Sequence, residues 1–67
     1  MYESEELVMR VIRLKTVVEI TGLARSTVYS YIAKGIFPKS ISLGGRCVGW
    51  VESEVHTWIQ ARVTERN

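Results

Sequence analysis

A glycine between two helical patterns constrains this chain more than any other feature. In the stretch TGLARSTVYSYIAKG, residues 21–35, Gly22 separates one apolar pattern of helical spacing from a second. Glycine tolerates the left-handed conformation that often ends a helix, so we expect a tight turn between two helices. A chain of 67 residues forms one domain and buries only about 60% of its unfolded surface. The two short helices must therefore be held by packing against a shared core.

The residues before Gly22 predict a short strand and a first helix. β-branched side chains in VIRL, residues 11–14, are typical of a strand. TVVE at residues 16–19 fits a capping box, in which the Thr16 hydroxyl accepts a hydrogen bond from the amide of Glu19 and the Glu19 side chain accepts one from the amide of Thr16. We therefore expect Thr16 to be the N-cap residue of the first helix, which follows it and ends by Gly22.

The second helix is expected to run from about Arg25 to Lys34 and to end at Gly35. One face of this helix carries side chains that can pack against a core, at Ala24, Val28, Tyr31 and Ile32. Lys34 suits the last turn, because the helix dipole favours a cation there. Packing thus explains the inner face of this helix but gives no role to its polar outer face.

A hairpin over residues 41–50 is predicted by Gly44 and Gly45, which fit a two-residue primed turn. In that register Ile41 faces Val48, and one face of the hairpin lies toward the core. This inner face carries the large apolar side chains of Ile41, Leu43, Val48 and Trp50. The outer face carries the small residues Ser40, Ser42, Cys47 and Gly49.

The last helix is expected to begin near Glu52, because acids at Glu52 and Glu54 suit a helix N-terminus. Five residues in this stretch repeat at helical spacing: Val51, Val55, Trp58, Ile59 and Arg62. We expect this helix to cover the core and to fray after Arg62. Three aromatic residues fall on apolar segments and are interpreted as core side chains rather than platforms for nucleic-acid bases: Phe37, Trp50 and Trp58.

The order strand, helix, tight turn, helix, hairpin and helix defines a small α+β domain. Two helices joined by a glycine-containing turn match a helix-turn-helix. The hairpin that follows makes the arrangement a winged helix-turn-helix. We assign residues 11–63 to this domain, residues 1–10 to a partly mobile N-terminal extension and residues 64–67 to a C-terminal tail.

Positive charge is concentrated in the middle of the chain. The whole chain has a net charge of +2, but residues 7–51 contain seven basic residues and one acid, a net charge of +6. The other acids lie within the first six and the last sixteen residues. A basic block between acidic ends predicts one electropositive face. The alternative is an ordinary solvated surface.

The chain lacks the residue patterns of a catalytic or metal site. Its one cysteine, Cys47, cannot form an internal disulfide, and its one histidine, His56, has only Glu52 at helical spacing. No cysteine and histidine residues have metal-ligand spacing, and neither a signal peptide nor a long apolar run is present. We expect a cytoplasmic protein with no enzyme activity, cofactor, metal ion or membrane partner.

Three separated motifs resemble the AlpA family of prophage regulators, whose members are similar to excisionase-like and MerR-like winged helix-turn-helix proteins. The motifs are TGLxRSTVY at residues 21–29, FPKxxxLGGR at residues 37–46 and GWxESEVxxWI at residues 49–59. The resemblance covers roughly residues 12–61. It implies a small double-stranded DNA-binding protein of phage or integrative-element origin that regulates transcription, associated with the nucleoid when bound to DNA.

Two positions depart from the family pattern. Ala24 stands where the family usually has a serine that would cap the second helix, and an N-cap alanine costs about 1 kcal/mol. Ser26 or Thr27 takes over part of that role, or the helix start is looser. Ser30 stands where the family often has arginine, which removes one contact and changes the target sequence.

The outer face of the second helix supplies the candidate DNA contacts, because a recognition helix presents its N-terminal residues to the major groove. Arg25 is expected at a guanine edge or a phosphate, and Ser26 and Thr27 at phosphate oxygens. Tyr29 has three open roles, which are base stacking, a phosphate contact and closure of the core edge. Ser30 completes this outward set.

Further contacts are expected from the end of the helix and from the wing. Lys34 and Lys39 add attraction that does not depend on DNA sequence. At the wing tip, residues 44–46, Gly45 allows close approach, and Arg46 supplies charge to the flanking backbone or the minor groove. For Arg46 the alternative is a solvated turn residue.

Two other functions fit the same residues. An excisionase, or recombination directionality factor, would use the same contacts to bend attachment-site DNA, with an integrase or other protein as partner. A protein-binding module on the same fold is the second alternative. Because so small a monomer covers few base pairs, self-association or cooperative binding on adjacent sites is expected in the DNA-binding cases.

Overall fold

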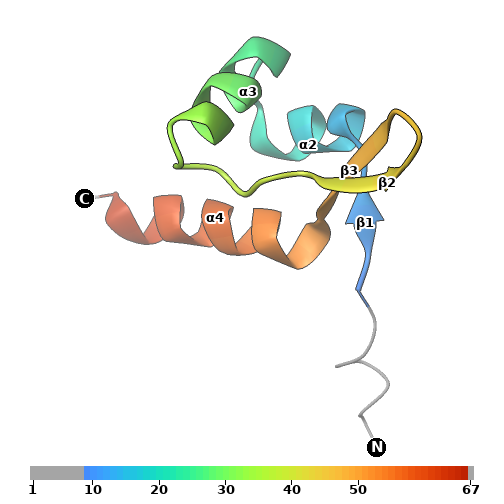
Figure 1. Ribbon diagram of the computed structural model, residues 1–67. Helices are drawn as coiled ribbons and strands as arrows, with labels where there is room; N and C mark the ends of the chain where they lie inside the picture. Colours follow the sequence, from blue (N-terminus) through green and yellow to red (C-terminus); the bar gives the residue numbers. More distant parts are fainter. Residues whose placement is uncertain (1–8, 67) are drawn as a thin grey trace, which may run out of the picture.

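The computed structural model describes residues 9–66 as a small α+β domain (Figure 1). Its elements are β1 (Val11–Ile12), α2 (Leu14–Thr21), α3 (Arg25–Ala33), β2 (Ile41–Gly44), β3 (Cys47–Val51) and α4 (Glu52–Glu65). The strands form an antiparallel sheet in the order β1-β3-β2. This confirms the winged helix-turn-helix architecture. Of the expected N-terminal extension, residues 1–8 lie outside the described residues, as does Asn67 of the tail.

A single core joins the three helices to the sheet. Its buried side chains come from every element except β2 and from the segment before the hairpin: Ile12, Val17, Val28, Phe37, Trp50 and Val55. Trp50 is fully buried, and Trp58 is half-buried against the same cluster. The interpretation of the two tryptophans and Phe37 as core side chains is therefore confirmed.

The first helix begins three residues earlier than expected, with Arg13 rather than Thr16 as its N-cap residue. Leu14 is its first residue, and the carbonyl of Arg13 accepts the first helical hydrogen bond from the amide of Val17, at 3.0 Å. No side chain caps this end. Thr16 lies inside the first turn, so the capping-box prediction is wrong. Leu14 packs against the core, and this tertiary contact outweighs the local capping signal.

The turn between α2 and α3 matches the expectation. Gly22 has a left-handed φ of 75°, and its amide donates to the carbonyl of Val18 at 2.9 Å. The Thr21 hydroxyl donates to the carbonyl of Val17 at 2.7 Å and accepts from the amide of Leu23 at 3.2 Å. Thr21 thus links the last turn of α2 to the chain that enters α3, a role that helical periodicity does not indicate.

The turn of the hairpin lies one residue later than expected. Gly45 and Arg46 form the turn, and Gly44 is the last residue of β2. The backbone φ is 107° at Gly44 and 55° at Gly45, values that favour glycine. Strand pairing is irregular between Ser42 and Gly44. The prediction of a primed turn centred on the two glycines is therefore wrong.

This shift changes which hairpin side chains face the core. Ile41 pairs with Gly49, so its expected pairing with Val48 is wrong, and Ser42 lies opposite Val48 instead. Because side chains alternate along a strand, a shift of one residue moves Ile41 and Leu43 to the face away from the core. Ile41 is 38% exposed and Leu43 46%, whereas Val48 packs against the core.

The last helix begins at Glu52 as expected but continues to Glu65. The expectation that it frays after Arg62 is wrong. The Arg62 guanidinium lies 5.1 Å from the centre of the Trp58 ring and 3.5 Å from a carboxylate oxygen of Glu65. A cation over an aromatic ring and a pair at i,i+3 both favour the helical conformation of this last turn.

Candidate nucleic-acid interface

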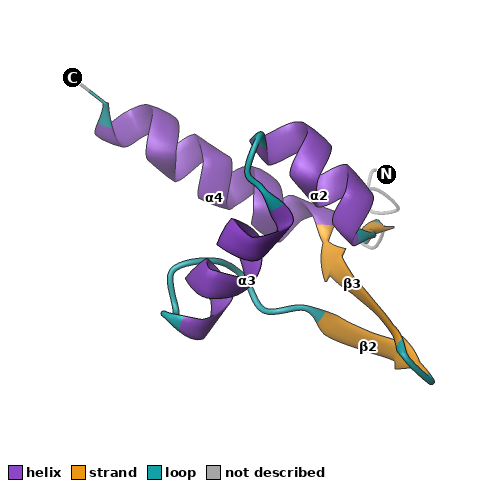
Figure 2. Ribbon diagram, turned by 90° about the horizontal axis from the view of Figure 1, so that it is seen from above, coloured by secondary structure: helices purple, strands orange, loops and turns teal. Residues whose placement is uncertain are grey.

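The second helix and the hairpin turn lie on the same side of the molecule. In Figure 1 they form its upper side, and α4 lies below them. Figure 2, seen from above, shows the hairpin extending away from α3, with the connecting segment between them. A helix and a hairpin that project together from one side can contact one surface of a partner.

The residues of α3 divide into an inner and an outer face. Val28 is fully buried, and Tyr31 and Ile32 are half-buried against the core. The other face is exposed and carries Arg25, Ser26, Tyr29, Ser30 and Ala33, followed by Lys34 at the C-cap. Thr27 is half-buried at the edge between the two faces. The structure therefore places the residues of α3 that are expected to contact DNA, together with Lys34, on or beside one exposed surface of this helix.

The start of α3 has no side-chain cap. Ala24 is the N-cap residue, and its carbonyl accepts from the amide of Val28 at 3.0 Å. Neither Ser26 nor Thr27 replaces the cap, since no side chain makes a capping hydrogen bond at this end. Amides of a first helical turn have no partner within the helix, so they are directed toward any acceptor placed beyond the helix end.

Tyr29 lies between the exposed surface and the core. It is 49% exposed, and its ring centre is 6.4 Å from that of Trp50 at an interplanar angle of 60°. One side of the ring therefore closes the core over Trp50, while the rest of the side chain stays accessible. Closure of the core edge and an outward contact are compatible at this position.

The wing contributes Gly45 and Arg46, which are exposed in the turn. The Ser42 hydroxyl accepts from the amide of Gly44 at 3.3 Å, within the end of β2 that leads into this turn. Lys39 is also exposed, two residues before β2. With Lys34, three exposed cationic side chains are thus placed along the chain that leads from α3 to the wing tip.

Acidic side chains gather on α4 instead. A carboxylate oxygen of Glu52 lies 3.6 Å from Nε of Arg10, and the other lies 3.9 Å from Nε2 of His56. Glu54 is exposed in the same first turn, and Glu65 pairs with Arg62 in the last turn. The side of the molecule formed by α4 is therefore more acidic than the side formed by α3 and the wing tip.

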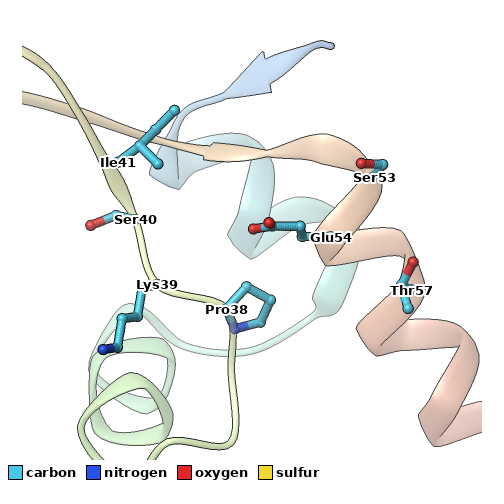
Figure 3. Close-up of a pocket in the computed structure, with 7 residues that line it drawn as sticks. All are labelled: Pro38, Lys39, Ser40, Ile41, Ser53, Glu54 and Thr57. Atoms are coloured by element: carbon cyan, nitrogen blue, oxygen red, sulfur yellow. The ribbon is translucent and has the colours of Figure 1, made fainter. Parts of the chain in front are cut away.

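An open hollow of about 600 Å³ lies between the segment before β2 and the first turns of α4 (Figure 3). Figure 3 shows the Glu54 carboxylate directed into the hollow and the Lys39 side chain directed away from α4. The lining residues are Pro38, Lys39, Ser40, Ile41, Ser53, Glu54 and Thr57. Of the residues expected to contact DNA, the hollow shares only Lys39.

Neither a metal cluster nor a membrane span occurs in the part of the chain that the structure describes. Among residues 9–66, no three side chains of histidine, cysteine, aspartate or glutamate are placed to hold a metal ion. No helix in this range is both long and apolar enough to cross a membrane.

Two hydrogen bonds near the interface were not anticipated from the sequence. The indole N–H of Trp50 donates to the carbonyl of Pro38 at 3.1 Å, and that of Trp58 donates to the carbonyl of Ile36. Both carbonyls belong to the segment between α3 and the wing. The fully buried indole of Trp50 requires an acceptor, but periodicity alone does not identify which carbonyl either indole contacts.

Comparison with known proteins identifies the family. The family model described as prophage CP4-57 regulatory protein (AlpA) matches residues 10–63. The uncharacterized protein ORF88 of Enterobacteria phage P4 is 46% identical over 57 residues, which are 85% of this chain and 65% of the phage protein. The chain therefore spans just under two thirds of that relative.

The match to a second relative covers a larger share of that relative's length. The DNA-binding transcriptional activator AlpA of Escherichia coli strain K12 is 37% identical over 60 residues, which are 81% of this chain and 86% of that protein. The family match includes both helices of the helix-turn-helix, the hairpin and most of α4. On this evidence the chain belongs to the AlpA family of prophage regulatory proteins.

Proposed function

We propose that this protein is a sequence-specific, DNA-binding transcriptional regulator of phage or integrative-element origin, acting in the cytoplasm at the nucleoid. One observation carries the proposal. The exposed cations and hydroxyls of α3 lie on the same side of the molecule as the wing tip, while acids gather on α4. The E. coli relative is described as a DNA-binding transcriptional activator, which supports this assignment.

In this proposal α3 enters the major groove of duplex DNA. Arg25 lies in the first turn, where a recognition helix approaches base edges, and a bidentate contact with guanine contributes about 1–3 kcal/mol of discrimination. Ser26 and Thr27 contact phosphate oxygens beside it. Because Ala24 leaves the first-turn amides without a side-chain cap, those amides also donate to a phosphate. Tyr29 and Ser30 complete the helix contacts.

The wing supplies contacts outside the major groove. Gly45 has no side chain, which allows the turn to approach the sugar-phosphate backbone closely, and Arg46 reaches a flanking phosphate or the minor groove. Lys34 and Lys39 add electrostatic attraction between the two contact regions. The helix and the wing together extend the contact beyond what α3 alone would make.

Binding measured as a function of salt tests the proposal. Each neutralised phosphate releases counterions, so log affinity for duplex DNA should fall with log salt by about 0.9 per phosphate contacted. The DNA is a fragment that carries the promoter of the protein's own gene, with a scrambled duplex of equal length as the control. A flat salt response would contradict DNA binding and would favour the protein-binding alternative. Equal affinity for both duplexes at physiological salt would contradict sequence specificity.

The same DNA distinguishes regulation from excision. A footprint on the promoter without a bend supports the regulator. Tighter binding to adjacent attachment-site DNA, with a bend detected by circular permutation of the site, would support the excisionase alternative and an integrase as its partner. We also propose that several copies bind adjacent sites cooperatively, because one small domain covers few base pairs. Doubling a single site should then raise the affinity per site.

A further inference from the structure

The segment between α3 and the wing, residues 34–40, begins as an extension of α3. The amide of Gly35 donates to the carbonyl of Ile32 at 3.0 Å, and the amide of Ile36 donates to the carbonyl of Tyr31 at 2.9 Å. Gly35 has a φ of 77°, which turns the chain away from the helix axis. The first part of the segment therefore has a fixed position relative to α3.

The middle of the segment is bonded to α4 through Trp58. The Trp58 indole N–H donates to the carbonyl of Ile36. The next residue, Phe37, is buried, and its ring meets the Trp58 ring edge-on, with the centroids 4.9 Å apart. The Arg62 guanidinium also lies 5.1 Å from the Trp58 ring centre. Figure 1 shows the segment passing between α3 and α4.

The end of the segment is bonded to β3 through Trp50. The Trp50 indole N–H donates to the carbonyl of Pro38 at 3.1 Å, and only two residues separate Pro38 from the start of β2. Two indoles, from α4 and from β3, thus hold carbonyls on either side of Phe37. Both hydrogen bonds lie along the stretch of chain that joins α3 to the wing.

We propose that Trp58 is a positioning residue for DNA recognition, which sets the spacing between α3 and the wing by holding the carbonyl of Ile36. The inference rests on the function proposed above. Trp50 has a comparable hydrogen bond, but its ring fills the core, so its loss would damage the fold itself. Trp58 is half-buried and belongs to a helix outside the helix-turn-helix and the wing. Without its bond, DNA binding would have to fix the part of the segment that leads from Ile36 to the wing, which weakens affinity.

The variant Trp58→Phe removes the indole donor and keeps an aromatic ring beside Phe37. We expect affinity for the specific duplex to fall about three- to tenfold, the range for one hydrogen bond. The slope of log affinity against log salt should also decrease by about 0.9 for each wing phosphate lost. The footprint should shorten on the wing side only. Gln60→Ala, an exposed position on the same helix, is the matched control and should bind as the wild type does.

A double-mutant cycle with Arg46→Ala separates positioning from general loss of stability. If Trp58 acts by placing the wing, then removing Arg46 from the Trp58→Phe protein should weaken binding much less than removing it from the wild type. Equal losses in the two backgrounds would contradict the proposal. So would wild-type affinity and footprint in Trp58→Phe. Failure of the wild type to bind the promoter duplex would instead contradict the proposed function.

A measurement on the wild type covers the case in which Trp58→Phe does not fold. Coupling between two sites is reciprocal. If DNA binding depends on the Trp58 hydrogen bond, then bound DNA must also strengthen that hydrogen bond. We expect hydrogen exchange at the Trp58 indole N–H, followed by NMR, to slow on addition of the specific duplex more than on addition of the scrambled one. The Trp50 indole serves as the internal reference. Equal exchange at Trp58 with both duplexes would overturn the proposal.

Discussion

At the scale of single residues, Ala24 shows how one side chain connects folding with recognition. It occupies the N-cap of α3 and offers no oxygen to the first-turn amides. An intramolecular cap would stabilise the helix by satisfying one amide, whereas an uncapped end presents all of its amides to an external acceptor. The proposed phosphate contact at this end thus uses donors that the fold itself leaves available.

Ala24→Ser is expected to stabilise the protein. The backbone at this position is already extended, with φ −69° and ψ 156°, so a serine hydroxyl can accept from the first-turn amides without rearrangement. The free energy of unfolding should increase by about 1 kcal/mol. In a domain of this size it corresponds to an increase in Tm of about 4–8 °C. Thermal unfolding followed by circular dichroism measures it, and an unchanged or lower Tm would show that the helix start does not accept this cap.

At the scale of elements, the hairpin shows where local signals are insufficient. Two adjacent glycines predicted the turn to within one residue, but a one-residue shift reverses the faces of a strand. In the structure Ile41 and Leu43 lie away from the core, and Val11 of the neighbouring strand is exposed on the same face. The hairpin side chains that pack in the core are instead Val48 and Trp50 of β3.

Replacing Ile41 and Leu43 together by threonine tests this register. Threonine keeps a high strand propensity, and both positions are more than a third exposed. The double variant should therefore lose about 2 kcal/mol or less of its free energy of unfolding. If both side chains were in the core, each replacement would cost about 2–5 kcal/mol. Urea unfolding measures the difference. A double variant that no longer unfolds cooperatively would favour the register expected from the two glycines.

Features set by local residues could be predicted from the sequence, whereas features set by contacts between distant residues could not. Gly22 and the spacing around Val28 define the turn and the inner face of α3, so the exposed face that carries the candidate site followed directly. The start of α2 did not follow, because packing of Leu14 outweighs the capping signal at Thr16. Nor did the bond from Trp58 to Ile36, which joins residues 22 positions apart. Periodicity places a tryptophan on one face of a helix but does not identify the carbonyl that accepts its indole N–H.

At the scale of the whole molecule, the fold converts a charge pattern along the chain into a charge pattern on a surface. The basic middle of the sequence forms the helix-turn-helix and the wing, and the acids of the last sixteen residues belong to α4. The Glu52 carboxylate is also engaged with Arg10 and His56, away from the wing tip. A polyanion should therefore approach the side of α3 and the wing rather than the side of α4.

The most direct test of this account compares two variants that remove one positive charge each. Arg25 lies in the first turn of α3, and Arg66 lies at the exposed C-cap of α4. Affinity for the specific and scrambled duplexes is measured by fluorescence anisotropy at one salt concentration. We expect Arg25→Ala to lose about 1–3 kcal/mol of discrimination between the two duplexes, whereas Arg66→Ala should discriminate as the wild type does. Equal losses in the two variants, or none in Arg25→Ala, would contradict recognition of DNA by α3.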